Sequence, residues 1–191
     1  FSLWERSLQD WLVAAALLLG GMALLRGVLG IVRSRLPDPQ STGARLGVRS
    51  VAGALVHSSR ALLLGLPLIL PASAVLAVSA TVASWLGSLA VIAIVVQAGI
   101  WGNALLGAWA ADYRRRHGEE MGGARVTTLN AMLFVARLIL FSLVALLALD
   151  NIPGVNVTAL VASLGIGGIA VALALQNILA DLFASLTITL D

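Results

Sequence analysis

Cysteine and lysine are both absent from this chain, and acidic residues number only 9 among 191. Without cysteine the chain can form no disulfide, no thiolate metal site and no thiol-based catalytic centre. The two histidines, His57 and His117, lie far apart in the sequence and have no partner at metal-ligand spacing. The sequence also shows no Ser/His/Asp arrangement and no paired carboxylates. We therefore predict that the chain is not an enzyme and that it holds no metal ion or cofactor.

Apolar residues, in contrast, are in large excess. They make up 60% of the chain, and the mean hydropathy is +1.00, far outside the range of soluble globular proteins. All 12 basic residues are arginine. No polar segment is long enough to fold into a basic soluble face, so we predict that these arginines meet a membrane surface and that the chain does not bind nucleic acid.

Five stretches are apolar and long enough to cross a bilayer core as helices. They cover residues 11–32, 61–80, 85–110, 129–149 and 155–175. Pro67 and Pro71 lie in the second stretch and are expected to kink it, and Trp85 and Trp109 are expected to mark the two membrane interfaces of the third. The predicted fold class is therefore an all-α membrane protein with five transmembrane helices.

The distribution of arginine predicts how the helices are oriented. The polar segments 33–60 and 112–128 carry nine arginines, whereas the connections near Thr81 and Asp150 carry none. Short loops rich in arginine stay in the cytoplasm. We therefore expect an inner (cytoplasmic) membrane protein whose N-terminus lies outside and whose C-terminus lies in the cytoplasm.

The last span contains no charged residue and is rich in glycine and alanine. Two faces of this helix carry small residues: Gly165, Gly168 and Ala172 form a smooth stripe, and Ala162 and Ala170, with Ile166 between them, form a rougher one. Ile169 and Leu173 lie one turn apart between the two faces. Small residues let membrane helices approach closely, so a helix of this kind can accept an identical neighbour on each side. The spacing alone is equally typical of a glycine-rich helix inside any multi-helix membrane protein.

The segment LGIGGIAVALALQNILADLFASL, residues 164–186, resembles the pore-lining third helix of the small-conductance mechanosensitive channel (MscS) family. The resemblance implies a ring of seven copies around a pore that membrane tension opens, releasing ions and small solutes on hypo-osmotic shock. It also implies that Ile169 and Leu173 occupy the two hydrophobic gate positions. The glycine and alanine stripe, Gly165, Gly168 and Ala172, is then expected to pack on Ala162, Ile166 and Ala170 of the next copy.

Two residues depart from the family's pattern. Asn177 stands where the family has a glycine at a helix kink, and Ile166 stands where it has a small residue. Asparagine tolerates non-helical backbone better than most residues, so we still expect a kink at Gln176 and Asn177. Beyond the kink, an amphipathic extension is expected along the inner interface, with its apolar side made by Ile178, Leu179, Leu182, Phe183 and Leu186.

The expected domain organisation follows from these spans. Residues 1–84 form two additional N-terminal helices with an arginine-rich cytoplasmic loop, residues 85–154 form a two-helix hairpin like a tension sensor, and residues 155–191 form the pore helix and its extension. The resemblance further implies a cytoplasmic β-domain after residue 191. The alternatives left open are a secondary transporter, or a membrane assembly domain that tension does not gate.

Two arginines interrupt apolar spans and are candidates for lipid or tension contacts. Arg26 lies near the end of the first span, where a long side chain can reach the interface. Arg137 lies inside the fourth span, where exposure to lipid is costly. It is expected to pair with an acid such as Asp112, to reach a lipid phosphate or to face a wet crevice, and a purely structural role is an equal alternative.

Overall fold

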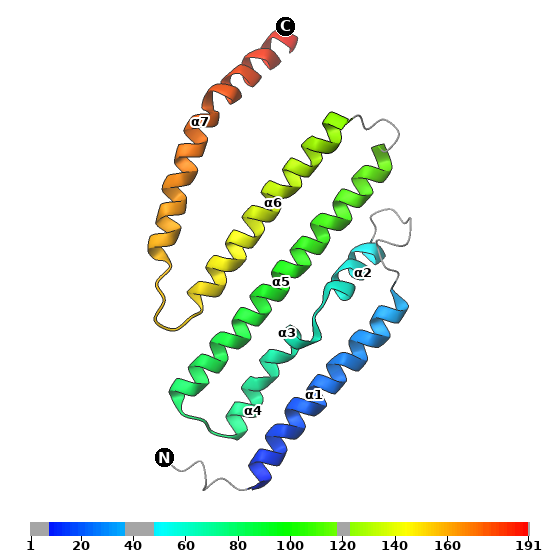
Figure 1. The fold of residues 1–191 in the computed structure, drawn as a ribbon, viewed down its shortest axis with the longest axis vertical. Helices are drawn as coiled ribbons and strands as arrows, with labels where there is room; N and C mark the ends of the chain where they lie inside the picture. Colours follow the sequence, from blue (N-terminus) through cyan, green and yellow to red (C-terminus); the bar gives the residue numbers. More distant parts are fainter. Residues whose placement is uncertain (1–7, 37–47, 118–122, 191) are drawn as a thin grey trace. The chain divides into compact units, whose positions relative to one another are not determined.

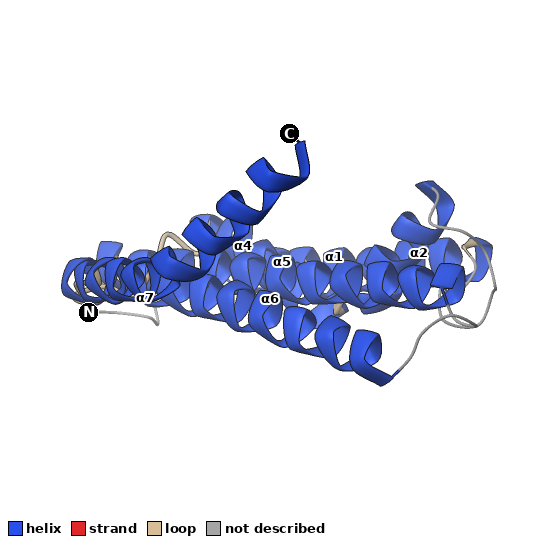
Figure 2. Ribbon diagram, turned by 90° about the horizontal axis from the view of Figure 1, so that it is seen from above, coloured by secondary structure: helices blue, strands red, loops and turns tan. Residues whose placement is uncertain are grey.

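The computed structural model describes residues 8–36, 48–117 and 123–190, with side chains described for residues 8–36, 50–117, 123–176 and 180. Every regular element in this part of the chain is helical (Figure 2). The elements are α1 (Leu8–Arg35), α2 (Val48–Ser58), α3 (Ala61–Gly65), the 3₁₀ turn η1 (Leu66–Leu68), α4 (Ile69–Val75), α5 (Ala80–His117), α6 (Gly123–Asp150) and α7 (Thr158–Leu190). The predicted all-α membrane fold is confirmed.

The chain divides into two compact units. The N-terminal unit is Phe1–Gly154 and the C-terminal unit is Val155–Asp191. Among the described residues, four helical segments are long and apolar enough to cross a membrane: Leu8–Arg35, Ala80–His117, Gly123–Asp150 and Thr158–Gln176. A fifth span exists if the bent pair Ser50–Ser58 and Ala61–Val75 counts as one. The chain is therefore a multi-pass membrane protein.

The N-terminal unit is a row of helices that run back and forth. α1 runs in one direction, α2 to α4 return, α5 runs parallel to α1, and α6 returns again (Figure 1). α3, η1 and α4 pack against both α1 and α5, and α6 packs against the other side of α5. α5, the longest described helix at 38 residues, therefore connects the two halves of this unit.

The structure differs from the prediction for the second span in two ways: the helix is interrupted, and it ends earlier. Instead of one kinked helix over residues 61–80, the chain forms α3, the turn η1 at Pro67, and α4, which ends at Val75. A proline in a helix interior removes a backbone hydrogen bond and displaces the preceding turn. Ala77 then adopts a left-handed backbone (φ 41°), and α5 begins at Ala80. A bend of 77° separates Ser50–Ser58 from Ala61–Val75, and this bend was not predicted.

α5 and α6 pack closely because α5 carries glycine where α6 carries branched side chains. A Cβ placed on Gly99 would lie 2.7 Å from Val144 Cγ2, and one on Gly102 would lie 3.0 Å from Leu140 Cδ1. Further along, a buried core forms from Ala110, Leu129 and Leu133, with Leu106 and Tyr113 packed against it. These contacts fix the register of α6 along α5.

We expect Gly99→Ala to weaken the α5–α6 contact. The new methyl group cannot fit 2.7 Å from Val144 unless the helices move apart, and overpacking of this kind costs about 1–3 kcal/mol. Gly87→Ala is the matched control, because it lies in the same helix and its added Cβ meets no atom within 4 Å. The free energy of unfolding of both variants in detergent micelles is the measurement. Equal values for the two variants would contradict the close contact.

Candidate functional site

The start of α7 is specified by its own sequence. Gly154 has a left-handed backbone (φ 85°) directly after Pro153, which lets the chain turn before the helix. Asn156 then accepts a hydrogen bond at its Oδ1 from the Thr158 backbone N–H, at 2.9 Å. A short polar side chain in this place satisfies a backbone donor that the helix leaves unpaired. α7 therefore begins at Thr158, three residues after the predicted start of the span.

Helix α7 presents the predicted pore residues without using them for packing inside its own unit. Every side chain from Thr158 to Gln176 is exposed, and Ile169 and Leu173 are 63% and 62% exposed. A Cβ built on Gly165 or Gly168 meets nothing within 4 Å. Since the segment is one continuous helix, the spacing read from the sequence places the small residues on two flanks with Ile169 and Leu173 between them. The roles assigned to these residues stay predictions.

The predicted kink at Gln176 and Asn177 does not interrupt the helix. The helical backbone continues through both residues to Leu190. The ribbon of α7 nevertheless changes direction towards its C-terminal end (Figure 1). Gln176 is exposed, whereas the side chains of Asn177 and of the apolar residues of the amphipathic extension lie outside the described part of the chain. The position of the bend and the placement of that extension stay predictions.

A second region, which the sequence did not reveal, lies where α2 meets α3. We call residues Ser58, Ser59 and Arg60 the α2–α3 joint. Gln97 of α5, only 1% exposed, accepts the Arg60 backbone N–H at its Oε1 (2.9 Å) and donates from Nε2 towards the Ser58 carbonyl (3.4 Å). Trp101, one turn along α5, donates its Nε1–H to the Ser59 hydroxyl at 3.0 Å. Two side chains of α5 therefore hold the break between the helices.

The carbonyl end of α2 is satisfied from a third helix. Arg33, in the last turn of α1, donates from Nε to the Val56 carbonyl at 3.2 Å and from Nη2 to the Ser59 carbonyl. A cation near the C-terminus of a helix also interacts favourably with its dipole. Arg33 was expected to be a charge of the cytoplasmic loop, and in the structure it holds α1 against α2. The signal that the sequence offered was Gln97, a polar residue within an apolar run.

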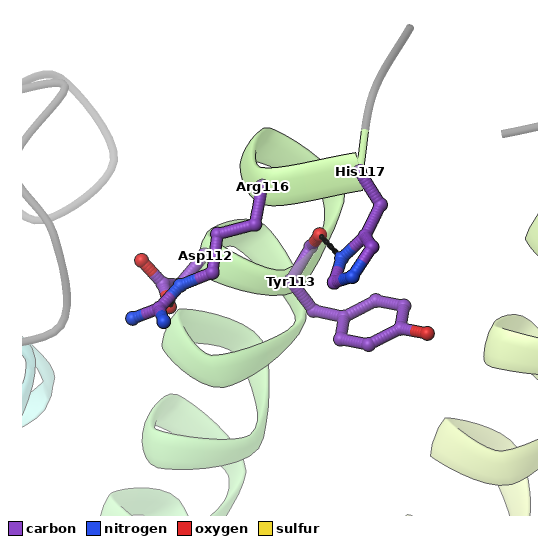
Figure 3. Close-up of polar contacts among 4 residues, drawn as sticks. All are labelled: Asp112, Tyr113, Arg116 and His117. Atoms are coloured by element: carbon purple, nitrogen blue, oxygen red, sulfur yellow. Dashed lines mark hydrogen bonds and ion pairs between the residues drawn. The ribbon is translucent and has the colours of Figure 1, made fainter. Parts of the chain in front are cut away.

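The arginine-rich end of α5 is ordered by its own side chains. On one side of the helix, Asp112 accepts a hydrogen bond from Arg116 Nε at 2.7 Å and forms an ion pair with it. On the other side the rings of Tyr113 and His117 are in tilted contact, with centroids 4.6 Å apart (Figure 3). Trp109 stacks on Tyr113, with ring centroids 5.7 Å apart. Aromatic rings that follow an apolar span and precede arginines are typical of a membrane interface.

The two candidate lipid contacts lie in different surroundings. Arg137 of α6 lines two cavities, of about 540 and 360 Å³, beside α5. Asp112, which was considered as its partner, is paired with Arg116 instead. Both arginines are exposed, but Arg26 of α1 lines neither cavity. The structure therefore brings Arg137, and not Arg26, into a concave site.

Comparison with known proteins places part of the chain in a family. Residues 134–176, from the middle of α6 to within α7, match the family model "Mechanosensitive ion channel, transmembrane helices 2/3". Two curated relatives, from two strains of Helicobacter pylori, are each 48% identical to the chain over 67 residues. Both carry the name "Uncharacterized MscS family protein".

The similarity to these relatives is confined to one segment. It covers 35% of this chain and 11% of each relative, so the chain spans a small part of the proteins that it matches. No solved structure matches the chain significantly. The matched family segment includes both predicted gate residues, Ile169 and Leu173, together with Arg137.

Proposed function

Because this chain belongs to the MscS family of membrane proteins, we propose that it forms a channel that opens under membrane tension and releases ions and small solutes on hypo-osmotic shock. The observation that carries the proposal is the match of residues 134–176 to the family's transmembrane helices 2/3. The exposed small-residue faces of α7 support it. The family consists of channels, and we propose neither a catalytic activity nor a cofactor.

A ring follows from the two small faces of α7. Gly165, Gly168 and Ala172 of one copy would pack on the face made by Ala162, Ile166 and Ala170 of the next, since membrane helices approach most closely where side chains are small. Ile166 is 71% exposed and is the bulky member of that face, so it would set the angle between neighbours. The number of copies, seven, comes from the family resemblance.

The pore would close by excluding water. Rings of Ile169 and Leu173, one helical turn apart, would line the narrowest part of the channel. A narrow apolar constriction expels water, and ions then face a barrier because they lose their hydration. Tension favours the wider ring in proportion to the extra membrane area that it occupies, which is a population shift between two states. Selectivity would be weak, since neither residue is charged.

The proposed orientation of this channel rests on the arginine bias, its domain organisation on the predicted spans, and its cytoplasmic β-domain on the family resemblance. We propose that the chain lies in the inner membrane with its N-terminus outside, that residues 1–84 add two helices to a hairpin over residues 85–154, and that a cytoplasmic β-domain continues after residue 191. The partners would be the lipid bilayer, further copies of the chain and the permeating ions and solutes. The arginine-free connections support this orientation.

Single-channel recording tests the function directly. Patches containing the purified full-length protein would be exposed to graded suction, with protein-free patches as the control. We expect current steps whose frequency rises with suction. A response to solute gradients without such steps would favour a secondary transporter, and a complete lack of both would favour an assembly domain.

Replacement of Gly168 tests the ring without disturbing the fold of one copy. The added Cβ meets no atom within 4 Å in the structure, and leucine favours helix more than glycine does by about 1 kcal/mol. We therefore expect Gly168→Leu to leave the helix intact and to reduce assembly, measured as the share of protein in the oligomer peak by size exclusion in mild detergent. Gly167→Leu, on another face and equally open, is the control. A full oligomer peak for Gly168→Leu would contradict the packing.

A further inference from the structure

The packing contacts of the N-terminal unit fix how far its helices are shifted along one another. A Cβ placed on Gly99 of α5 would lie 2.7 Å from Val144 Cγ2 of α6. The two helices run in opposite directions (Figure 1), so Asp150, six residues after Val144 at the end of α6, lies at about the level of Ala93. α5 begins thirteen residues before that level, at Ala80. Its first turns therefore extend about 20 Å past the end of α6.

α1 is placed on the same scale through α3. Gln97 of α5 accepts the backbone N–H of Arg60 at 2.9 Å. Five residues later in the chain, a Cβ placed on Gly65 would meet the end of the Met22 side chain of α1. Because α3 runs antiparallel to α5, Met22 lies about five residues before Gln97 along α5, at the level of Ile92. α1 runs parallel to α5, so this contact assigns a level to every residue of α1.

The charged residues that bound the apolar spans of α1 and α6 lie at different levels. Asp150 of α6 lies about thirteen residues of helix further along α5 than Asp10 of α1. At the other end, Arg125 of α6 lies about fifteen residues further along than Arg33 of α1. α6 is therefore shifted relative to α1 by about 20 Å at one end and about 22 Å at the other. The shift is nearly equal at both ends, so it belongs to the whole apolar span.

A flat membrane must nevertheless hold both spans at the same depth, because charged side chains are costly in its apolar layer. α1, α4, α5 and α6 lie side by side in one layer (Figure 1, Figure 2). Neighbouring helices are about 8–10 Å apart, so the three steps from α1 to α6 cover about 27 Å. A shift of about 20 Å over this distance fits a flat bilayer when the helices are inclined by about 35–40°. Upright helices would leave one span about 20 Å out of register with the other.

We propose that the N-terminal unit lies in the bilayer with its helix axes inclined by about 35–40° to the membrane normal, in the plane of the helix row. The tryptophans of α5 support this placement. Trp85 and Trp109 are exposed and lie 24 residues, or about 36 Å, apart along the helix. At the proposed inclination this separation projects to about 28–29 Å, which matches a hydrocarbon core of about 30 Å. Such an inclination is at the upper end of the range for membrane helices, whose average is about 20°.

The packing contacts thus select the bilayer that the unit fits. Gly99 against Val144 and Gln97 against Arg60 hold the shift between the helices, and the shift sets the inclination. Together with the lengths of the spans, the inclination defines an apolar layer of about 28–30 Å. A much thicker bilayer requires the helices to slide along one another, which breaks these contacts. The placement needs only insertion into a membrane, so it does not depend on the proposed channel activity.

The test measures the depth of single spin labels, because residues 1–191 contain no cysteine. The full-length protein, with any cysteine outside this segment replaced by serine, carries Leu19→Cys on α1 or Ile139→Cys on α6, at residues that are 73% and 64% exposed. In dioleoylphosphatidylcholine liposomes, the depth of each label follows from its collisions with oxygen and with a nickel chelate. We expect both labels near the bilayer centre, within about 5 Å of the same depth. Upright helices would separate them by about 22 Å.

A second pair of labels repeats the measurement nearer to the interface. Leu12→Cys on α1 and Leu147→Cys on α6, at residues 69% and 45% exposed, are expected at equal depth. Upright helices would place them about 21 Å apart. Ile139→Cys and Leu147→Cys lie eight residues apart in one helix and must differ in depth by about 10 Å, which calibrates the method. Depths that agree to within about 10 Å in both pairs support the inclination, and a larger difference in either pair overturns it.

An image of the unlabelled protein keeps the proposal falsifiable if a label disturbs the fold. A cryo-electron microscopy map of the full-length protein in a lipid nanodisc gives the angle between α5 and the membrane normal directly. We expect about 35–40°. An angle below about 20°, the average for membrane helices, overturns the proposal.

Discussion

Replacing Leu173 by serine is expected to open the channel at lower membrane tension. The predicted constriction stays dry because its side chains are branched and apolar, and a hydroxyl at this ring gives water a partner. Burying a leucine side chain is worth about 1.5–3 kcal/mol. Every copy in the ring loses this contribution, so the ratio of open to closed channels at a given tension should rise at least roughly tenfold. The measurement is the suction at half-maximal open probability in patches with the full-length protein.

Two further variants separate gating from a general loss of apolar surface. Val171 is 60% exposed and, two residues before Leu173, points to nearly the opposite side of the helix at about 100° per residue. Val171→Ser should therefore change the opening tension little. Leu173→Val keeps the constriction apolar and should behave almost as the unchanged protein does. An opening tension for Leu173→Ser equal to that of Val171→Ser would remove Leu173 from the gate.

The membrane-spanning helices were predictable because their signal is strong and local. Runs of apolar residues without charge must satisfy their backbone hydrogen bonds internally in lipid, and a helix does so at every residue. The helices α1, α5 and α6 each extend past the predicted span at both ends. Hydropathy marks only the part of a helix that meets lipid. The helix itself continues into water where the polar residues that follow, such as Arg114 and Arg116, have a high helix propensity.

The break between α2 and α3 was not predictable, because it depends on residues far apart in the sequence. Ser59 and Arg60 look like the end of a polar loop when they are read locally. Their backbone and hydroxyl groups are satisfied by Gln97 and Trp101 of α5 and by Arg33 of α1, across 26 to 42 residues of sequence. Pairing between distant segments leaves no periodic signal, so Gln97 stood out only as a polar residue in an apolar run.

For α7 the sequence predicts where residues lie on the helix, but it does not show what they contact. Periodicity places Gly165, Gly168, Ile169 and Leu173 on their faces of the helix, and the exposed, continuous α7 is compatible with that placement. What such faces contact is set by other copies of the chain and by lipid. A single chain's sequence carries that information only through its resemblance to a family. The experiments on Gly168 and Leu173 therefore address what the pattern cannot decide.

Substitution of Gln97 by methionine is expected to destabilise the N-terminal unit strongly. Methionine has nearly the same length and volume, so it fills the space and removes only the amide. The Arg60 N–H loses its acceptor at 2.9 Å and the Ser58 carbonyl loses its donor at 3.4 Å, next to a side chain that is 1% exposed. A buried polar group left without a partner costs about 1–3 kcal/mol. With two such groups, we expect a loss of roughly 2–5 kcal/mol in the free energy of unfolding in micelles.

The size of this loss distinguishes a hydrogen-bonded joint from ordinary core packing. Trp101→Phe removes a single donor to the Ser59 hydroxyl, which still donates to the Leu55 carbonyl, so it should cost only about 1 kcal/mol. Asn103→Leu also replaces an amide by an apolar side chain in α5, at a residue without hydrogen bonds in the described part of the chain, and should be nearly neutral. If Gln97→Met were as stable as Asn103→Leu, the break between α2 and α3 would not depend on α5. A large loss of free energy of unfolding confined to Gln97→Met would instead show that one amide of α5 holds the bent pair α2 and α3 together. Side chains of this kind let a membrane protein contain polar backbone groups without exposing them to lipid.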